Sequence, residues 1–197
     1  MTAPSPTVAG ITAAEFRHAI GHFATGVTVV TSIGADGEPV GTTANAVSSL
    51  SLDPPLVLVC FDRGSLTLAA VISHGAFVVN VLAAPQQHLS ANFARRGLAA
   101  AWDGVRHRPG RTGSPKLHDV LATLECTVEH RLPGGDHEIV VGRVRDVETS
   151  ATPAARSSSS AAATPRWPWM RTGGRSPGRC PPPDPRPVLP QRRRYRG

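Results

Sequence analysis

Residues 41–67 constrain the fold of this chain more than any other stretch. They contain two segments of small polar residues, 41–51 and 62–67, separated by an Asp-Pro-Pro turn and an apolar run. The run at 56–61 is apolar at every position, which predicts a short strand covered on both faces. Small polar residues leave backbone N–H groups accessible and add hydroxyl and amide donors. Two such segments flanking one strand suit a flat, partly apolar ligand that carries phosphate.

Most of the chain up to residue 148 has the pattern of short strands joined by tight turns. Runs of β-branched or alternating apolar residues predict strands at 27–33, 40–47, 56–61, 77–82, 121–130 and 138–147. Helical spacing predicts a helix that begins with a capping box of Thr12 and Glu15 and stops at Gly26, a helix from 65 to 74 closed by His74-Gly75, and a helix from 86 to 96. Pro-Gly-Gly-Asp at 133–136 predicts a turn. This content favours an all-β core with peripheral helices, a β-barrel and not a parallel α/β sheet.

The positive charge of the chain belongs to its last quarter. The formal net charge is +7, with 21 Lys and Arg against 14 Asp and Glu. Residues 1–150 contain 11 basic and 13 acidic residues, a net charge of −2, whereas residues 151–197 contain ten arginines and one acid, a net charge of +9. A protein that reads nucleic acid usually carries its basic patch on a folded face. We therefore expect no specific binding of nucleic acid.

Composition changes at residue 149. Residues 149–197 hold ten prolines and ten arginines, and apolar periodicity is lost. Two interpretations are open: a natural low-complexity tail that is disordered, or a reading frame that shifted near residue 149, since a GC-rich segment read out of frame has such a composition. Residues 1–10 are predicted to be a flexible leader. The predicted folded domain is residues 11–148.

The cysteines and histidines do not form clusters of the kind that bind metals. Cys60 and Cys126 sit in apolar runs and are expected to be buried. His18 and His22 are one helical turn apart, but no third ligand is visible, so a solvated helix face is preferred and no metal site is expected. No apolar run approaches the roughly 20 residues of a membrane span, and residues 1–10 lack a signal pattern. We expect a cytoplasmic protein without membrane contact.

Two segments of the opening stretch are candidates for binding a phosphorylated ligand. The first comprises residues 42–46 and 48–51, although a Ser- and Thr-rich strand end is by itself more often structural. The second, residues 62–67, directly precedes a predicted helix, where hydroxyls and free backbone N–H groups form an anion site and Arg63 adds charge. Its alternative role is simple N-capping by Ser65, with Arg63 solvated. The two segments together favour the ligand.

Eight motifs in the same order make the chain resemble the short-chain flavin reductase family, whose fold is the FMN-binding split barrel. Each motif is weak alone, but together they cover about residues 13–148. They are Thr-Gly-Val-Thr-Val-Val-Thr at 25–31, Gly-x-Thr-Ala-Asn at 41–45, Ser-x-Ser-Leu-Asp-Pro-Pro at 49–55, the apolar strand ending at Cys60, Arg-x-Ser-x-Thr at 63–67, Phe-Val-Val-Asn-Val-Leu at 77–82, Gln-His-Leu-Ser-Ala-Asn-Phe-Ala at 87–94 and Gly-Asp-His at 135–137.

The resemblance implies a homodimeric, Greek-key split β-barrel that binds FMN or FAD, reduces it with NADH or NADPH, and passes the reduced flavin to a partner monooxygenase. The implied contacts to the flavin ring and ribityl chain are Thr42, Thr43, Ala44, Asn45, Ala46, Ser48, Ser49, Leu50 and Ser51. The implied phosphate contacts are Arg63, Ser65 and Thr67. The resemblance further places Phe93, Ala94 and Arg95 near the outer half of the flavin, and His137 at the nicotinamide side as the catalytic residue.

The chain departs from the family pattern in two places. Ala46 stands where a serine is common, so one hydroxyl contact is missing. The family's closing strand and C-terminal segment have no counterpart after Glu148, which puts dimer packing and one edge of the cofactor site in question. Two other functions therefore stay open: a non-catalytic FMN- or deazaflavin-binding protein of the same barrel shape, and a fragment that its altered C-terminus leaves inactive.

Overall fold

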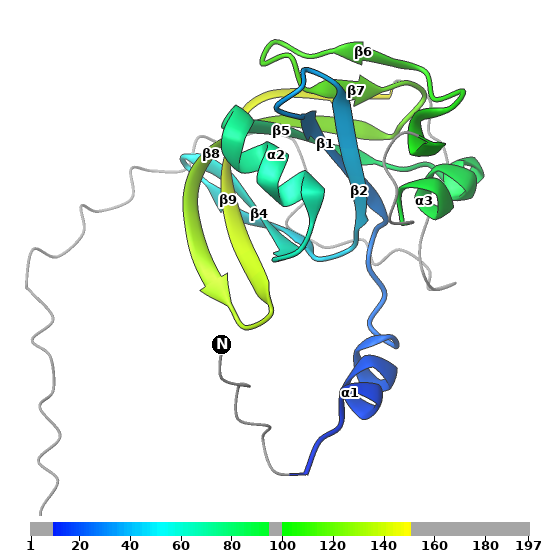
Figure 1. The fold of residues 1–197 in the computed structure, drawn as a ribbon, viewed down its shortest axis with the longest axis vertical. Helices are drawn as coiled ribbons and strands as arrows, with labels where there is room; N and C mark the ends of the chain where they lie inside the picture. The colour runs from blue at the N-terminus through cyan, green and yellow to red at the C-terminus, as the bar shows by residue number, and fades with distance from the viewer. Residues whose placement is uncertain (1–9, 95–99, 151–197) are drawn as a thin grey trace, which may run out of the picture. The chain divides into compact units, whose positions relative to one another are not determined.

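The computed structural model describes residues 10–94 and 100–150, which form an antiparallel sheet with a few helices (Figure 1). The elements in chain order are α1 (Ala13–Ile20), β1 (Thr28–Ile33), β2 (Pro39–Ala44), β3 (Val47–Leu52), β4 (Pro55–Asp62), α2 (Leu66–His74), β5 (Ala76–Val81), η1 (Ala84–Gln86), α3 (Gln87–Phe93), η2 (Ala100–Trp102), β6 (His107–Pro109), β7 (Pro115–Leu117), β8 (Ala122–Gly134) and β9 (His137–Thr149). This content confirms the predicted all-β core with peripheral helices. The predicted leader and tail lie almost wholly outside the described residues. Among the described helices, none has the length and apolarity needed to cross a membrane.

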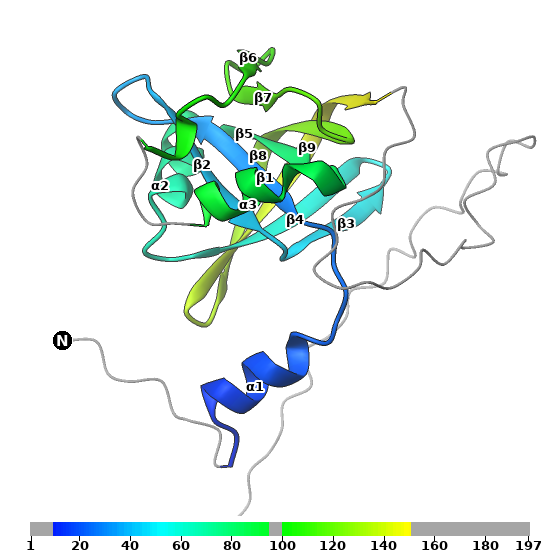
Figure 2. The same cartoon turned by 90° about the vertical axis from the view of Figure 1, so that its right-hand side faces the viewer.

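Seven strands form one sheet in the order β2-β1-β5-β8-β9-β4-β3, and all neighbouring pairs are antiparallel. The edge strands β2 and β3 are joined by only two residues, Asn45 and Ala46, yet they are not ladder partners. The sheet therefore curls until its two edges meet at this connection, as Figure 2 shows, without closing by hydrogen bonds. The open edge between β2 and β3, called the seam below, is the split of a split barrel.

The main core lies between the curled sheet and helix α2. Its fully buried members include Val30, Val59, Val71, Phe77 and Val140. Gly142 of β9 makes room for the ring of Phe77, because a Cβ at Gly142 would lie 2.4 Å from Phe77 Cζ. A second apolar cluster, which includes Val29, Leu82, Leu89 and Phe93, holds α3 against β1. Both helices that flank the seam are thus fixed by packing.

The predicted helix at 65–74 is confirmed with its caps. Ser65 is the N-cap of α2, and its Oγ accepts the N–H of Leu68 at 3.4 Å. Gly75 ends the helix in the left-handed conformation, with φ of 74°, and its N–H donates to Val71. A glycine adopts this conformation without the steric cost that other residues incur. The N-terminus of α2 is therefore set at the end of β4.

Strand β3 was not predicted. The pattern at 40–47 indicates one strand, but β2 ends at Ala44 and Val47 already belongs to β3. The Ser-rich strand β3 has no apolar alternation, because it is an edge strand with four of its six residues exposed. The prediction for 56–61 is partly wrong. Alternate residues Val57, Val59 and Phe61 are buried, whereas those between them are only half-buried.

Helix α1 has the predicted capping box but ends at Ile20, earlier than expected. The N–H of Glu15 donates to Thr12 Oγ1 at 3.2 Å, and the N–H of Thr12 donates back to the Glu15 carboxylate at 2.7 Å. None of its residues is buried. Phe16, Ile20 and the following Phe23 are 61%, 53% and 68% exposed. This helix presents an apolar face to solvent.

A buried ion-pair network fastens β7 to β8 and β9. Lys116 Nζ lies 2.9 Å from a carboxylate oxygen of Glu125, 2.6 Å from Asp146 and 2.9 Å from Glu148. Lys116 and Glu125 are 2% and 0% exposed. Burial opposes the charge of each, but the three carboxylates raise the pKa of Lys116. Likewise, the N–H of Thr112 and the ammonium of Lys116 outweigh burial and lower the pKa of Glu125 to about 2.

Candidate functional site

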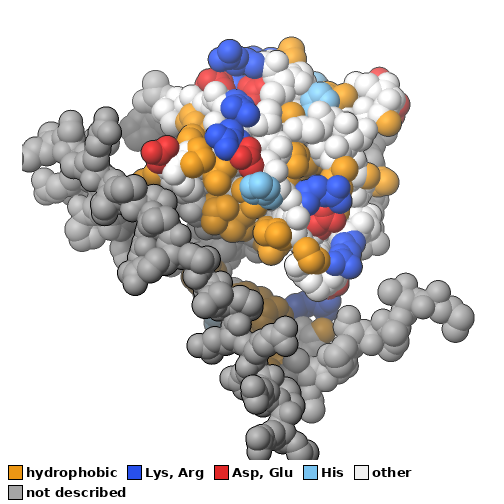
Figure 3. Space-filling model, turned by 90° about the vertical axis from the view of Figure 1, so that its left-hand side faces the viewer, with side chains coloured by type: hydrophobic (Ala, Val, Ile, Leu, Met, Phe, Trp, Pro, Cys, Tyr) orange, Lys and Arg blue, Asp and Glu red, His pale blue; other side chains and the backbone are white. Residues whose placement is uncertain are grey.

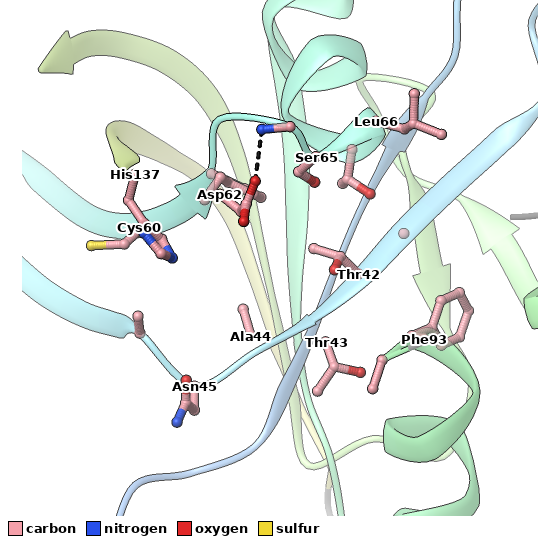
Figure 4. Close-up of a pocket in the computed structure, with 16 residues that line it drawn as sticks. Thr42, Thr43, Ala44, Asn45, Cys60, Asp62, Ser65, Leu66, Phe93 and His137 are labelled. Atoms are coloured by element: carbon pink, nitrogen blue, oxygen red, sulfur yellow. Dashed lines mark hydrogen bonds between the residues drawn. The ribbon is translucent and has the colours of Figure 1, made fainter. Parts of the chain in front are cut away.

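A pocket of about 340 Å³ opens at the seam, where β2, the end of β4, the N-terminus of α2, the end of α3 and the start of β9 meet (Figure 4). In that view His137 and Cys60 lie on one side and Phe93 on the other, with Ser65 and Leu66 along one rim. The predicted site residues that line it are Thr42, Thr43, Ala44, Asn45, Ala46, Ser65, Thr67, Phe93, Ala94 and His137. Residues far apart in sequence thus converge on one hollow.

The β2 side of the pocket is held in place by its contacts with α3. Thr43 Oγ1 donates to the carbonyl of Ser90 at 2.7 Å. A Cβ at Gly41 would lie 3.0 Å from Phe93 Cε1, so only glycine lets the Phe93 ring pack this close to the strand. On the other side, the N–H of Cys60 in β4 donates to the carbonyl of Ala46 at 3.0 Å, next to the β3–β4 ladder. The polar wall at 42–46 is therefore braced on both sides.

The N-terminus of α2 forms a second, donor-rich wall. Asp62 Oδ1 accepts the N–H of Gly64 at 2.7 Å, the bond drawn in Figure 4, and the Asp62 carbonyl accepts the N–H of Ser65 at 2.9 Å. These bonds hold the loop in a turn. Ser65 Oγ is an acceptor in its capping bond, so its O–H is left to donate elsewhere. The first turn of α2 carries no acidic residue, so the positive end of the helix dipole is not neutralised there.

His137 enters the pocket from the tight turn between β8 and β9. Its Nδ1 lies 2.7 Å from Asp136 Oδ1, so this nitrogen carries the proton and donates it. The same hydrogen bond lowers the pKa of Asp136. In the ladder His137 pairs with Asp62, the last residue of β4. The histidine is thus placed by strand register beside the loop that leads into α2.

Five predicted site residues are not brought into the pocket. Ser48, Ser49, Leu50 and Ser51 lie along β3 and do not line it. Arg63 does not line it either; its Nε donates to the carbonyl of His137 at 3.3 Å. Arg95 lies outside the described residues.

Six residues of the pocket wall were not named individually as contacts: Gly41, Cys60, Phe61, Asp62, Gly64 and Leu66. Asp62, Gly64 and Leu66 lie inside segment 62–67, which was predicted as an anion site. Gly41, Phe61 and Cys60 lie one or two positions outside the predicted segments, so extending each segment by two residues would have included them.

The described wall fits a flavin. It combines hydroxyl and amide groups at 42–45 with apolar surface from Ala44, Leu66 and Phe93, which suits a ring with a polar edge and apolar faces. The helix N-terminus with Ser65 and Thr67 suits a phosphate. Within the described residues, no group of three His, Cys, Asp or Glu side chains is placed to hold a metal ion.

A split barrel with a donor-rich pocket at its seam is the architecture of a flavin nucleotide-binding protein. The chain belongs to the flavin reductase like domain family, whose pattern it matches over residues 20–165. It is 46% identical over 138 residues to a probable flavin reductase of Rhizobium meliloti strain 1021, covering 68% of this chain and 43% of that protein. It is 42% identical over 130 residues to the reductase subunit HsaB of a flavin-dependent monooxygenase of Rhodococcus jostii strain RHA1, covering 66% of each chain.

The fold agrees with a solved structure. The Streptomyces globisporus NADH:FAD oxidoreductase SgcE6, in complex with NAD and FAD fragments, superposes with a TM-score of 0.68 at 35% identity, covering 73% of this chain and 85% of that one. The present chain spans less than half the length of the Rhizobium meliloti relative and about two thirds of the Rhodococcus one.

Proposed function

We propose that the protein is an NAD(P)H-dependent flavin reductase that uses FMN or FAD as the electron acceptor. The observation that carries this proposal is the convergence, in one pocket, of the polar wall at 42–46, the N-terminus of α2 and His137. The family membership supports it, and so do relatives named as flavin reductases. The pocket has a volume of about 340 Å³, and in Figure 4 His137 lies on the side opposite Phe93.

A bound flavin would accept a hydride from the nicotinamide, so the chain has to bind and orient but need not supply a nucleophile. Thr42, Thr43 and Asn45 would hydrogen-bond the polar edge of the ring, and Phe93 would cover its outer half. Ser65 and Thr67, at the start of α2, would hold the phosphate. His137, whose Nδ1 is held by Asp136, would present its other nitrogen to the nicotinamide side.

The acceptor of the reduced flavin is proposed to be a separate monooxygenase. Relatives at 42% identity are named as the reductase subunit of a flavin-dependent monooxygenase and as the reductase component of a nitrophenol monooxygenase. The cytoplasm is the proposed location, since Cys60 and Cys126 are both free thiols, as the reducing cytoplasm maintains them.

A homodimer is the proposed assembly. The apolar face formed by Phe16 and Ile20 of α1 and by Phe23, which follows the helix, is exposed in the single chain. Large apolar side chains are also exposed on β3, among them Leu52 at 90%. Figure 3 shows hydrophobic side chains gathered on one face of the molecule, beside charged ones of both signs. A second copy of the chain would cover such surfaces. Sedimentation of the full chain beside Phe16→Ser tests this: a dimer that the substitution turns into monomer supports it, and a monomeric parent excludes it.

The reductase proposal is tested by anaerobic NADH oxidation with and without added FMN, together with the visible spectrum of the purified protein. The expected result is NADH oxidation that depends on flavin and is slowed about tenfold or more by His137→Ala, with flavin binding retained. Flavin binding without any NADH or NADPH oxidation would instead identify a non-catalytic flavin-binding protein. A protein that neither binds flavin nor oxidises NADH or NADPH would be an inactive fragment.

A further inference from the structure

Arg63 joins two loops that are far apart in the sequence. Its backbone N–H donates to the carbonyl of Asp136 at 3.2 Å, and its side-chain Nε donates to the carbonyl of His137 at 3.3 Å. Asp136 belongs to the turn between β8 and β9, and His137, 74 positions after Arg63, is the first residue of β9. Arg63 itself directly follows β4 and opens the loop that leads into α2.

The turn that Arg63 contacts is exposed to solvent. Gly135 at its tip has φ of 69°, and Asp136 is 92% exposed on its side chain. The turn closes the long β8–β9 hairpin (Figure 1), and β4 pairs with β9 as far as His137, which lies opposite Asp62. Within the described residues, Arg63 is the one side chain from outside the hairpin that donates a hydrogen bond to residues 135–137. The ladders with β4 and β8 set the backbone of His137, and Arg63 adds the side-chain contact that ties this turn to the 62–67 loop.

We propose that Arg63 is a positioning residue for His137, and not a ligand of the flavin phosphate. Its side chain does not line the pocket, whereas Ser65 and Thr67 from the same loop do. The loop at 62–67 would then have two roles. Its end at the start of α2 would bind the phosphate, and Arg63 would position His137 at the nicotinamide side. This inference rests on the proposed reductase function, because it assigns His137 a place in that reaction.

Two substitutions separate the two roles of Arg63. Arg63→Met keeps an apolar stem and removes all side-chain donors. Arg63→Lys keeps the positive charge, which would serve a phosphate, but lacks the Nε–H that reaches the His137 carbonyl. Arg106→Met is the matched control, since Arg106 is 71% exposed and pairs with Asp119 outside the pocket.

The first measurement uses protein without flavin. Hydrogen exchange of the residue-63 amide reports directly on the bond to Asp136. Both Arg63 variants should exchange at this amide about tenfold faster than the parent and the Arg106 variant, with unchanged protection in β5. Parent-like exchange in both variants would overturn the proposal.

The second measurement compares binding of FMN with binding of riboflavin, which lacks the phosphate. If Arg63 positions His137, both variants bind each flavin within about threefold of the parent. If Arg63 holds phosphate, Arg63→Met loses affinity for FMN alone, Arg63→Lys largely restores it, and the proposal fails. These two results stand even if the parent does not oxidise NADH, an outcome that would refute the reductase function separately.

The third measurement is the single-turnover rate of flavin reduction by NADH. Arg63→Met and Arg63→Lys should each slow it about tenfold or more. Because Arg63 acts through His137, adding Arg63→Met to His137→Ala should cause little further loss. Losses that multiply in the double variant would show that Arg63 acts independently of His137 and would contradict the proposal.

Discussion

The imidazole Nδ1 of His137 lies 2.7 Å from Oδ1 of Asp136, the residue that precedes it. The carboxylate can only accept, so the proton of the neutral ring sits on Nδ1 and the other nitrogen is an acceptor. Arg63 donates to the carbonyls of both Asp136 and His137. The turn at residues 135–137 therefore sets the position, the orientation and the tautomer of the histidine.

His137→Ala should slow hydride transfer from NAD(P)H to flavin by about tenfold or more, because the group at the nicotinamide side is lost. Flavin affinity should stay within a few-fold, since the phosphate and ring contacts are unchanged. Stopped-flow reduction under anaerobic conditions gives the rate, and fluorescence titration gives the affinity. Reduction as fast as in the parent would remove His137 from the site.

Replacing Ser65 and Thr67 together by Ala should lower FMN affinity by at least about tenfold, because hydrogen bonds to a charged group contribute about 1.5–3 kcal/mol each. Ser65 also caps α2, so the double variant is expected to lose some stability as well.

Ser65→Asp separates these two effects. Aspartate is a good N-cap, so α2 stays capped, but its charge repels a phosphate. FMN binding should weaken while riboflavin binding is kept. Equal binding of FMN by parent and variant would show that the phosphate lies elsewhere.

The buried Glu125–Lys116 pair predicts a loss of stability in acid. Glu125 has a folded pKa of about 2, below its ordinary value of about 4.5. Its contribution is therefore full above about pH 4.5 and is lost as the pH falls from there to about 2. The shift corresponds to roughly 3 kcal/mol. Urea unfolding of the parent and of Glu125→Gln should diverge at neutral pH and converge near pH 2; a constant difference across this range would contradict the assignment.

Gly142→Ala should destabilise the fold by about 1–3 kcal/mol, since the added methyl group overlaps the Phe77 ring and the strand cannot move away within a central sheet position. Phe77→Leu should partly rescue it by removing the overlapping atoms, at its own cost in packing. Thermal unfolding of both single variants and the double variant gives the coupling between the two sites. Additive effects would show that the ring and the glycine do not meet.

Residues beyond Ser150 are predicted to be dispensable for activity. Their composition, ten prolines and ten arginines, cannot bury enough apolar surface to offset the entropy of ordering. The truncation should fall after Ser150 and not at Glu148, because Thr149 ends β9 and the N–H of Ser150 donates to Leu121. NADH oxidation by the truncated and full chains should agree within about twofold. A large loss on truncation would overturn the tail and frame-shift interpretations alike.

Local signals in the sequence predicted the elements that depend on local chemistry. The capping box of α1, the Ser65 and Gly75 caps of α2 and the turn before His137 all follow from side chains within a few positions of one another. The polar segments at 42–46 and 65–67 were found because small residues cluster there. That both segments would meet in one pocket was predicted by the family resemblance. The periodicity of the sequence alone did not predict it.

What the sequence did not predict depends on long-range contacts. Strand β3 lacks apolar alternation because its position at the sheet edge removes the need for it. Lys116 becomes buried only because β8 and β9 bring three carboxylates around it. The sequence around Arg63 predicts an anion ligand, because only nearby residues are considered. In the structure its side chain donates to the carbonyl of His137, which belongs to a hairpin distant in the sequence.

The unpaired seam between β2 and β3 has a consequence for how this fold can change. A closed barrel would use the facing backbone groups of its edge strands in a ladder, and the sheet would gain stability from each bond. Here residues 41–46, from β2 and its connection to β3, line the pocket, so a ladder that paired them with β3 would close the space a ligand needs. Substitutions that extend pairing across Asn45 and Ala46 should therefore make the protein harder to unfold and, at the same time, narrow its pocket.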